Sequence, residues 1–267
     1  MRRPRGLSLV LGLALLVPLV VAPAAHAATC AFAGSTLTIT YAANDVVTLA
    51  VSGSSITMNG AACGAATTAN TNLITTAGTV TGNESLVLDL SGGALAPGSA
   101  SEAGGAAEIE IRADLGALND TVVLVGAAGT DAFDFGTVGL NLNDDDDADV
   151  TIVNVESIVV QTGAGNDRVS ALGSGGSGGP LATPVVLQGG DGHDDLQGGT
   201  GADELAGGAG DDVLSGGDGN DIAEGGDGAD TVRGDGGNDV LRGGGGDDAL
   251  SGEDGADTVL GEPGATA

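Results

Sequence analysis

Apolar and polar positions alternate through the N-terminal half of the chain. At residues 36–41, Leu37, Ile39 and Tyr41 alternate with threonines, which is the period of a half-buried β-strand. Asn-Asp and Ser-Gly pairs separate further runs of this kind, as expected for turns. A stretch rich in Gly, Ser, Ala and Pro at residues 95–107 predicts a surface loop. The other predicted strands cover residues 46–51, 55–58, 85–90, 108–112, 121–125 and 150–160.

A second period begins further along the chain. Residues 189–260 divide without a gap into eight nonapeptides, the first of which reads GGDGHDDLQ. Asp occupies the sixth place of all eight, and the eighth place is Leu or Val except at Ala223. Eight consecutive matches in phase indicate a true repeat. Each apolar eighth place predicts a short strand that points one side chain inward, so two nonapeptides form one coil with a turn at each of two edges.

The polar places of the repeat predict a metal-binding turn. Glycine at the first, second and fourth places allows the positive φ angles of a tight turn and leaves carbonyl oxygens unshielded. The sixth-place carboxylate adds a further hard oxygen ligand, and together these suit Ca²⁺. Ions then lie between turns that are two repeats apart. Four turns on each edge leave three gaps on each edge, which predicts about six calcium ions.

This block resembles the RTX, or haemolysin-type, calcium-binding repeat, whose pattern is G-G-x-G-x-D-x-U-x. The resemblance implies an all-β fold, a right-handed parallel β-roll (a β-solenoid), in which carbonyls of the first four places and the sixth-place Asp coordinate Ca²⁺. Asp235 and Glu253 replace the second Gly, so we expect their two turns to be distorted. The metal-site residues so implied are Asp194, Asp203, Asp212, Asp221, Asp230, Asp239, Asp248 and Asp257 with Gly189, Gly190, Gly192, Gly198, Gly199, Gly201, Gly207, Gly208, Gly210, Gly216, Gly217, Gly219, Gly225, Gly226 and Gly228.

The region ahead of the repeats divides into several predicted parts. Residues 28–80 form a predicted disulfide-stapled β-meander, and residues 81–170 an irregular β-solenoid, because Asp131 and Asp167 stand four times nine residues apart. Residues 171–188 are a Gly/Ser/Pro linker with a short strand, and residues 261–267 a tail. Residues 28–188 are similar in arrangement to the leader region of secreted actinobacterial RTX-like proteins.

Residues 1–27 have the pattern of a secretory signal peptide. Arg2, Arg3 and Arg5 precede an apolar run, and Ala25-His26-Ala27 fits the A-x-A cleavage rule. A membrane anchor is the alternative, but Pro18 interrupts a run that is short for a span. We therefore expect a secreted, extracellular protein that begins at Ala28.

The two cysteines, Cys30 and Cys63, both follow the predicted cleavage site. In an exported chain such a pair is more often a disulfide than a metal site or a catalytic thiol. In the predicted mature chain no histidine stands near them in the sequence, which disfavours zinc.

The negative net charge of the chain argues against some classes of binding partner. With 37 acidic residues and seven Arg, three of them in the signal peptide, the protein repels nucleic acid and anionic membranes. No Trp and only four other aromatics leave thin layers of aliphatic side chains as the core. Thin burial and dense negative charge together predict that the repeats fold only when calcium is bound. The acidic run at residues 144–149 is either a solvated loop or an extra calcium site with Asp131 or Asp167.

The sequence offers no enzyme site. The G-x-S-x-G match at residues 175–179 lies in a Gly/Ser linker, and His193, at a variable place of a repeat turn, has no context for a triad. We therefore predict a non-enzymatic, extracellular calcium-binding protein with a structural role. The alternative is a cell-surface adhesin or surface-layer component that displays the N-terminal β region to a cell-wall or surface partner.

Overall fold

The computed structural model describes residues 28–79, 81–92, 110–137, 139–141, 150–173 and 177–261. The predicted signal peptide, the whole predicted loop at residues 95–107, the acidic run at 144–149 and part of the G-x-S-x-G match lie outside the described residues. The described residues contain β-strands and no α-helix. The prediction of an all-β fold with a parallel β-roll is confirmed.

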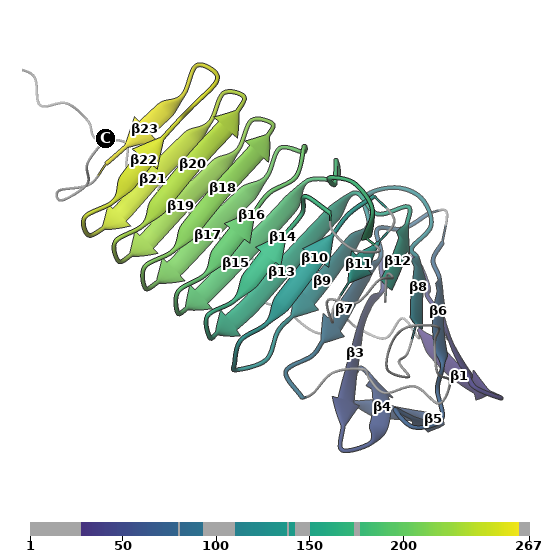
Figure 1. Ribbon diagram of the computed structural model, residues 1–267. Coiled ribbons are helices and arrows are strands. Elements are labelled where there is room, and N and C mark those ends of the chain that lie inside the picture. Colours follow the sequence, from purple (N-terminus) through teal and green to yellow (C-terminus); the bar gives the residue numbers. More distant parts are fainter. Residues whose placement is uncertain are drawn as a thin grey trace, which may run out of the picture.

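Two long sheets face each other, and in the array the chain passes from one to the other at each turn (Figure 1). Across the first sheet the strands are β1 (Thr29–Ala33), β2 (Thr36–Thr40), β6 (Leu73–Ala77), β8 (Glu110–Asp114), β12 (Val150–Val153), β11 (Leu140–Asn141), β10 (Ala132–Phe135), β14 (Arg168–Ser170), β16 (Asp195–Gln197), β18 (Val213–Asp218), β20 (Thr231–Gly236) and β22 (Ala249–Ser251). Across the second they are β5 (Ala61–Thr67), β4 (Ser55–Met58), β3 (Val46–Ser52), β7 (Ser85–Asp89), β9 (Thr121–Val125), β13 (Ser157–Ala164), β15 (Val185–Asp191), β17 (Glu204–Ala209), β19 (Ile222–Asp227), β21 (Val240–Gly245) and β23 (Thr258–Leu260).

The coils shorten toward the C-terminus. Along the second sheet, paired residues are 39 apart at the N-terminal end, then 36, then 27, and finally 18 throughout the nonapeptide array. The strands of the array pair in parallel at this constant spacing. The eighteen-residue coil predicted from two nonapeptides is therefore present from β15 onward.

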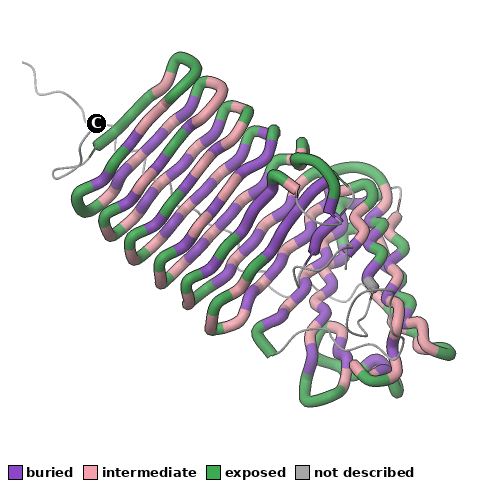
Figure 2. The backbone as a smooth tube through the Cα atoms, viewed as in Figure 1, coloured by how far each residue is buried: buried purple, intermediate pink, exposed green. Residues whose placement is uncertain are grey.

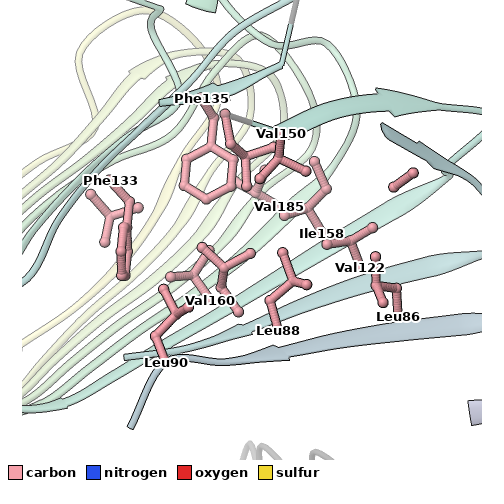
Figure 3. Packing of buried hydrophobic residues seen from close by; sticks show 14 of the residues in the cluster. Leu86, Leu88, Leu90, Val122, Phe133, Phe135, Val150, Ile158, Val160 and Val185 are labelled. Carbon is pink, nitrogen blue, oxygen red and sulfur yellow. The ribbon is translucent and has the colours of Figure 1, made fainter. Parts of the chain in front are cut away.

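The core lies between the sheets and changes in composition along the axis. Figure 2 shows buried and less buried residues alternating along most of the strands, as the period of a strand requires. In the array each strand except β23, whose Val259 is exposed, buries one aliphatic eighth-place residue, such as Leu205 or Leu214. The N-terminal coils bury larger layers, which include Phe133 and Phe135 (Figure 3). The deeper apolar core therefore belongs to the part of the chain without the repeat.

The N-terminal end is built partly from antiparallel strands. Strands β1 and β2 form one antiparallel hairpin, and β3, β4 and β5 form a three-stranded antiparallel unit. A disulfide joins Cys30 on β1 to Cys63 on β5. Residues 28–80 are not a pure meander, however, because β2 pairs with β6 and β3 with β7 in parallel. This region is thus the first part of the same two sheets, with the disulfide linking one sheet to the other.

The single strand predicted over residues 150–160 is wrong. The structure divides it into β12 and β13, which belong to different sheets. Asn154 lies between them with a positive φ of 56°, a conformation that Asn tolerates better than most residues. The apolar alternation continues across this turn, so the sequence pattern alone does not reveal it.

Candidate calcium-binding turns

The sixth-place aspartates form two rows, one along each edge where the chain crosses between sheets. Turns that precede strands of the first sheet make up the first edge, and turns that precede strands of the second sheet make up the second edge. The first edge carries Asp194, Asp212, Asp230 and Asp248. The second edge carries Asp203, Asp221, Asp239 and Asp257.

Each row is a hydrogen-bonded ladder. The backbone N–H of Asp194 donates to Oδ1 of Asp212 at 2.8 Å, and that of Asp203 donates to Oδ1 of Asp221 at 2.7 Å. The other rungs repeat this bond between turns eighteen residues apart. All of these aspartates are buried except Asp257, the last rung of the second edge. The structure therefore brings the predicted carboxylates into line.

The second oxygen of these carboxylates is what points to a cation. At five of the sixth-place aspartates Oδ2 is buried and has no hydrogen-bond partner among the described residues. Burying a carboxylate oxygen without a partner is costly, whereas a divalent cation would satisfy it. The oxygens concerned belong to Asp194, Asp212, Asp221, Asp230 and Asp239.

The first-place glycines leave room beside these oxygens. A Cβ placed on Gly207 would clash with Oδ2 of Asp212 and lie 2.6 Å from the carbonyl oxygen of Gly225 in the next turn of the same edge. At Gly189 and Gly225 the corresponding distance to the next carbonyl is 2.7 Å. A carboxylate oxygen and a carbonyl oxygen thus converge on space that any side chain would fill. We call this space the first-place cradle.

The glycines of the repeat have two separate roles. Most of those at the second and fourth places have the predicted positive φ, for example 119° at Gly208 and 127° at Gly210. The first-place glycines have φ outside the left-handed region, so the prediction that they supply a positive φ is wrong. They are needed for space. The sequence cannot separate these roles, because both select glycine.

The two turns without a second glycine keep the shape of their neighbours. Asp235 has a φ of 66° and Glu253 a φ of 62°, so both adopt the left-handed conformation of the residues they replace. Each also gains a side-chain partner, the Ser215 hydroxyl for Asp235 and the Ser251 hydroxyl for Glu253. The Asp239 carboxylate of the first of these turns still accepts its ladder bond. The expected distortion is therefore absent from the backbone of these described turns.

Burial shifts the acidity of the row. The pKa of Asp212 and that of Asp221 are raised to about 6. Burial is the largest cause, and repulsion from neighbouring carboxylates adds to it. Backbone N–H donors oppose this shift without cancelling it. The pKa values of Asp194, Asp203, Asp230 and Asp239 are also raised, with burial as the first cause. A bound cation would favour the charged form of the same groups.

The ladder extends beyond the repeats, which sequence reasoning missed in part. On the first edge Asp131 N–H donates to Asp167 Oδ1 at 2.7 Å, and Asp167 N–H to Asp194 Oδ1 at 2.8 Å. On the second edge Glu84 N–H donates to Asp120 Oδ1 at 2.6 Å, and Asp120 N–H to Glu156 Oε2 at 2.8 Å. The available signal was an acidic residue directly before a strand, repeated every 36 residues.

The histidine of the array has a structural partner. His193 Nδ1 accepts the N–H of Asp211 at 2.7 Å, and His193 N–H donates to Asn166 Oδ1 at 3.1 Å. His193 thus continues an exposed row of fifth-place side chains along the first edge. Among the described residues, no group of three or more His, Cys, Asp and Glu side chains is placed to hold a metal. A metal in the candidate turns therefore depends on backbone carbonyls as well as on carboxylates.

The array matches a known family model. Residues 188–223 and 224–259 each match the model of the RTX calcium-binding nonapeptide repeat (4 copies). No curated protein and no solved structure matches the chain. The matched residues coincide with the eighteen-residue coils and their carboxylate ladders. The C-terminal array therefore consists of RTX repeats, and these indicate calcium binding with a structural role.

Proposed function

We propose that the protein is a secreted, non-enzymatic calcium-binding protein whose nonapeptide array folds when calcium binds. The observation that carries this proposal is the buried, unpartnered Oδ2 of five sixth-place aspartates, each beside an open first-place cradle. In this view calcium is a structural element of the array, since it supplies the counter-charge and the cohesion that the thin apolar layer lacks.

The metal ligands would come from the turns themselves. The sixth-place carboxylates and the backbone carbonyls of the first four places would hold Ca²⁺, which favours several hard oxygen ligands. First-place cradles that face a carbonyl of the next turn lie at Gly189, Gly207 and Gly225 on the first edge and at Gly198, Gly216 and Gly234 on the second. Six such cradles support a count of about six ions for the array.

Charge supports a necessary role for calcium. Residues 189–260 contain 19 acidic residues and two Arg, and the ladders align the carboxylates of successive turns. Like charges stacked at the spacing of β-strands repel one another unless a cation lies between them. The one aliphatic residue buried per nonapeptide cannot offset the conformational entropy of nine ordered residues, several of them glycine. We therefore expect the array to be unfolded in calcium-free solution.

Secretion is supported by the sequence and by the repeat type. Residues 1–27 have the signal-peptide pattern, and RTX repeat proteins are typically secreted. In the part of the chain that the structure describes, no helix is long and apolar enough to cross a membrane. An array that stays unfolded in the low-calcium cytoplasm and folds outside the cell would suit export.

A calcium titration of the full mature chain tests the proposal. Far-UV circular dichroism and small-angle scattering should report a cooperative gain of strand and a smaller radius as Ca²⁺ rises toward the millimolar range. Mg²⁺ at equal concentration is the control and should act poorly, because it requires tighter octahedral geometry and sheds water reluctantly. The same strand content and radius in EDTA and in calcium would overturn the proposal.

A further inference from the structure

Two turns upstream of the matched array continue its first edge. Residues 126–131 lead into β10 and residues 162–167 lead into β14, and β10, β14 and β16 pair in parallel in sequence. Their acidic residues, Asp131 and Asp167, are rungs of the same ladder as Asp194. The family model begins only at residue 188. These two turns therefore create two further gaps that the repeat match does not assign.

The gap between residues 126–131 and 162–167 has an open cradle. Gly126 stands five residues before Asp131, as each first-place glycine stands before its aspartate. A Cβ on Gly126 would clash with Asp131 Oδ2 and lie 2.8 Å from the carbonyl oxygen of Thr162 in the next turn. The cradles at Gly189 and Gly207 face the next carbonyl at 2.7 and 2.6 Å. The upstream turn thus presents the same two kinds of oxygen around the same space.

A buried carboxylate borders this gap from the other side. Asp167 is 2% exposed, and its Oδ1 accepts the Asp131 N–H across the gap, so the carboxylate group lies between the two turns. Among the described residues its Oδ2 has no hydrogen-bond partner. In the array Oδ2 lies beside the first-place residue of its own turn, as Asp212 Oδ2 does at Gly207, so by this geometry the free oxygen of Asp167 lies on the side of Thr162 and Oδ1 is the oxygen that borders the gap at Gly126.

Asp131 itself has the contacts of a repeat carboxylate. Its Oδ2 accepts the Ala127 N–H at 2.9 Å, and the equivalent Oδ2 of Asp203 inside the array accepts the Gly199 N–H at 2.7 Å. Burial is the first cause of a raised pKa at both carboxyl groups. The bond from Ala127 therefore does not distinguish the upstream turn from the turns of the array.

The next gap, between residues 162–167 and 189–194, is filled by a side chain. Thr162 occupies the first place, is 1% exposed, and its Oγ1 donates to the Gly189 carbonyl at 2.8 Å and to the Gln188 carbonyl at 3.3 Å. In the array this space lies beside glycine and this carbonyl faces the cradle. The threonine hydroxyl thus satisfies an oxygen that a cation would otherwise bind.

We propose that Gly126, Asp131, Asp167 and the Thr162 carbonyl form one additional site for a hard divalent cation such as Ca²⁺, which the Thr162 side chain separates from the calcium row of the array. This site adds one ion to those of the proposed function, and the identity of the metal rests on that function. It assigns a cation to the long-coil part of the solenoid, where the repeat pattern gives no reason to expect one.

Native mass spectrometry of the full mature chain in CaCl₂ counts bound ions and tests this site. Gly126→Ala puts a methyl group into the cradle without a φ penalty, so we expect one ion fewer than in the wild type. Gly179→Ala is the matched control, because a Cβ there meets no described atom within 4 Å and its φ is also outside the left-handed region. It should bind the wild-type number. Thr162→Gly should open the blocked cradle and bind one ion more.

The ion counts distinguish failure of the additional site from failure of calcium binding by the array. If the wild type binds no calcium, the proposed function fails. If it binds calcium and Gly126→Ala holds as many ions as Gly179→Ala, only the additional site is refuted. Should Gly126→Ala lose strand signal, Asp131→Asn replaces it, since this change removes the charge with little change in shape, and an unchanged count would then refute the site. A Thr162→Gly variant that gains no ion would overturn the blocking role of Thr162.

Discussion

The long N-terminal coils and the short coils of the array share two sheets but differ in what fills them. The N-terminal coils bury Phe133, Phe135 and layers of Leu, Ile and Val, whereas the array buries at most one aliphatic residue per strand. The array instead aligns glycine cradles and unpartnered carboxylate oxygens along its edges. Longer coils leave room for more apolar packing between the sheets, whereas the short coils of the array, under the proposed function, are stabilised by cations.

The same acidic ladder serves both regions. At the second edge of the long coils, Glu84 and Asp120 cap backbone N–H groups, and the Thr79 hydroxyl donates to Glu84 Oε1 at 2.6 Å. At the first edge, the Thr162 hydroxyl plays a comparable role toward a carbonyl. In the array, glycine leaves such places empty of side chain. An acidic residue before the strand is thus common to both regions, and under the proposed function the residue five places before it determines whether a hydroxyl or a cation occupies the space beside the carboxylate.

The largest expected effect is the loss of packing in the long coils. Phe135 is fully buried, so Phe135→Ala should destabilise this region by about 3 to 5 kcal/mol. The loss should be equal in EDTA and in calcium, because the region is held by apolar contacts. Chemical denaturation in both buffers measures it. Leu214→Ala in the array is the comparison variant, and its loss of stability should be detectable only in calcium. If the destabilisation by Phe135→Ala were seen only in calcium, the two regions would not be independently stable.

Removal of the disulfide should affect the same region somewhat less. The Cys30–Cys63 bond spans 33 residues and joins the two sheets at their N-terminal end. A double replacement by Ser should cost about 3 to 4 kcal/mol, mainly by freeing the unfolded chain. Thermal unfolding in EDTA measures the loss, and the calcium count of the array should stay the same. A reduced calcium count in this variant would show that the two ends of the solenoid are coupled.

The array could be predicted from the sequence because each place of the nonapeptide has one role. A period of nine residues is short enough to recur eight times, and the sixth-place Asp and eighth-place Leu or Val fix turn and strand together. The role of first-place glycine was misjudged, because room for a cation and conformational freedom select the same residue. These two reasons for glycine can be told apart only in the structure, where the Asp212 carboxylate lies beside Gly207.

The long coils were harder to predict. Their acidic rungs vary between Asp and Glu, recur only every 36 residues, and have no glycine frame around them, as Glu84, Asp120 and Glu156 illustrate. The alternation of apolar residues also runs across the turn at Asn154, where the chain changes sheets. Local patterns therefore give strands in this region but not the sheet to which each strand belongs.

Position within the row should grade the effect of losing a carboxylate. Asp221→Ala and Asp230→Ala each remove a ligand that borders two gaps, whereas Asp257→Ala removes one that borders a single gap at the end of the second edge. A bond to a charged group contributes about 1.5 to 3 kcal/mol, so we expect at least about a tenfold weaker calcium response for the inner variants. Calorimetric titration should show a smaller loss for Asp257→Ala. Equal losses in all three would contradict binding between stacked turns.

The smallest expected effect is a partial replacement of calcium by protons. The pKa of Asp212 and Asp221 is about 6 in the folded array, above the value of about 3.9 for an unfolded Asp. Protonation therefore favours the fold: the stabilisation is complete below about pH 4 and is lost as pH rises through about 6. In EDTA, circular dichroism should show more strand at pH 4 than at pH 7. No difference, or the opposite order, would mean that charge repulsion is not what holds the array open.

Hydrogen exchange of the full mature chain, with and without calcium, tests the contrast between the two regions most directly. In calcium, backbone amides of both regions should be protected. In EDTA, we expect β7, β9 and β13 to stay protected while β17 to β21 exchange at the rate of an unfolded chain. Equal protection of the array strands in EDTA and in calcium would contradict calcium-dependent folding, and loss of protection in β7, β9 and β13 would contradict an apolar core that stands without calcium.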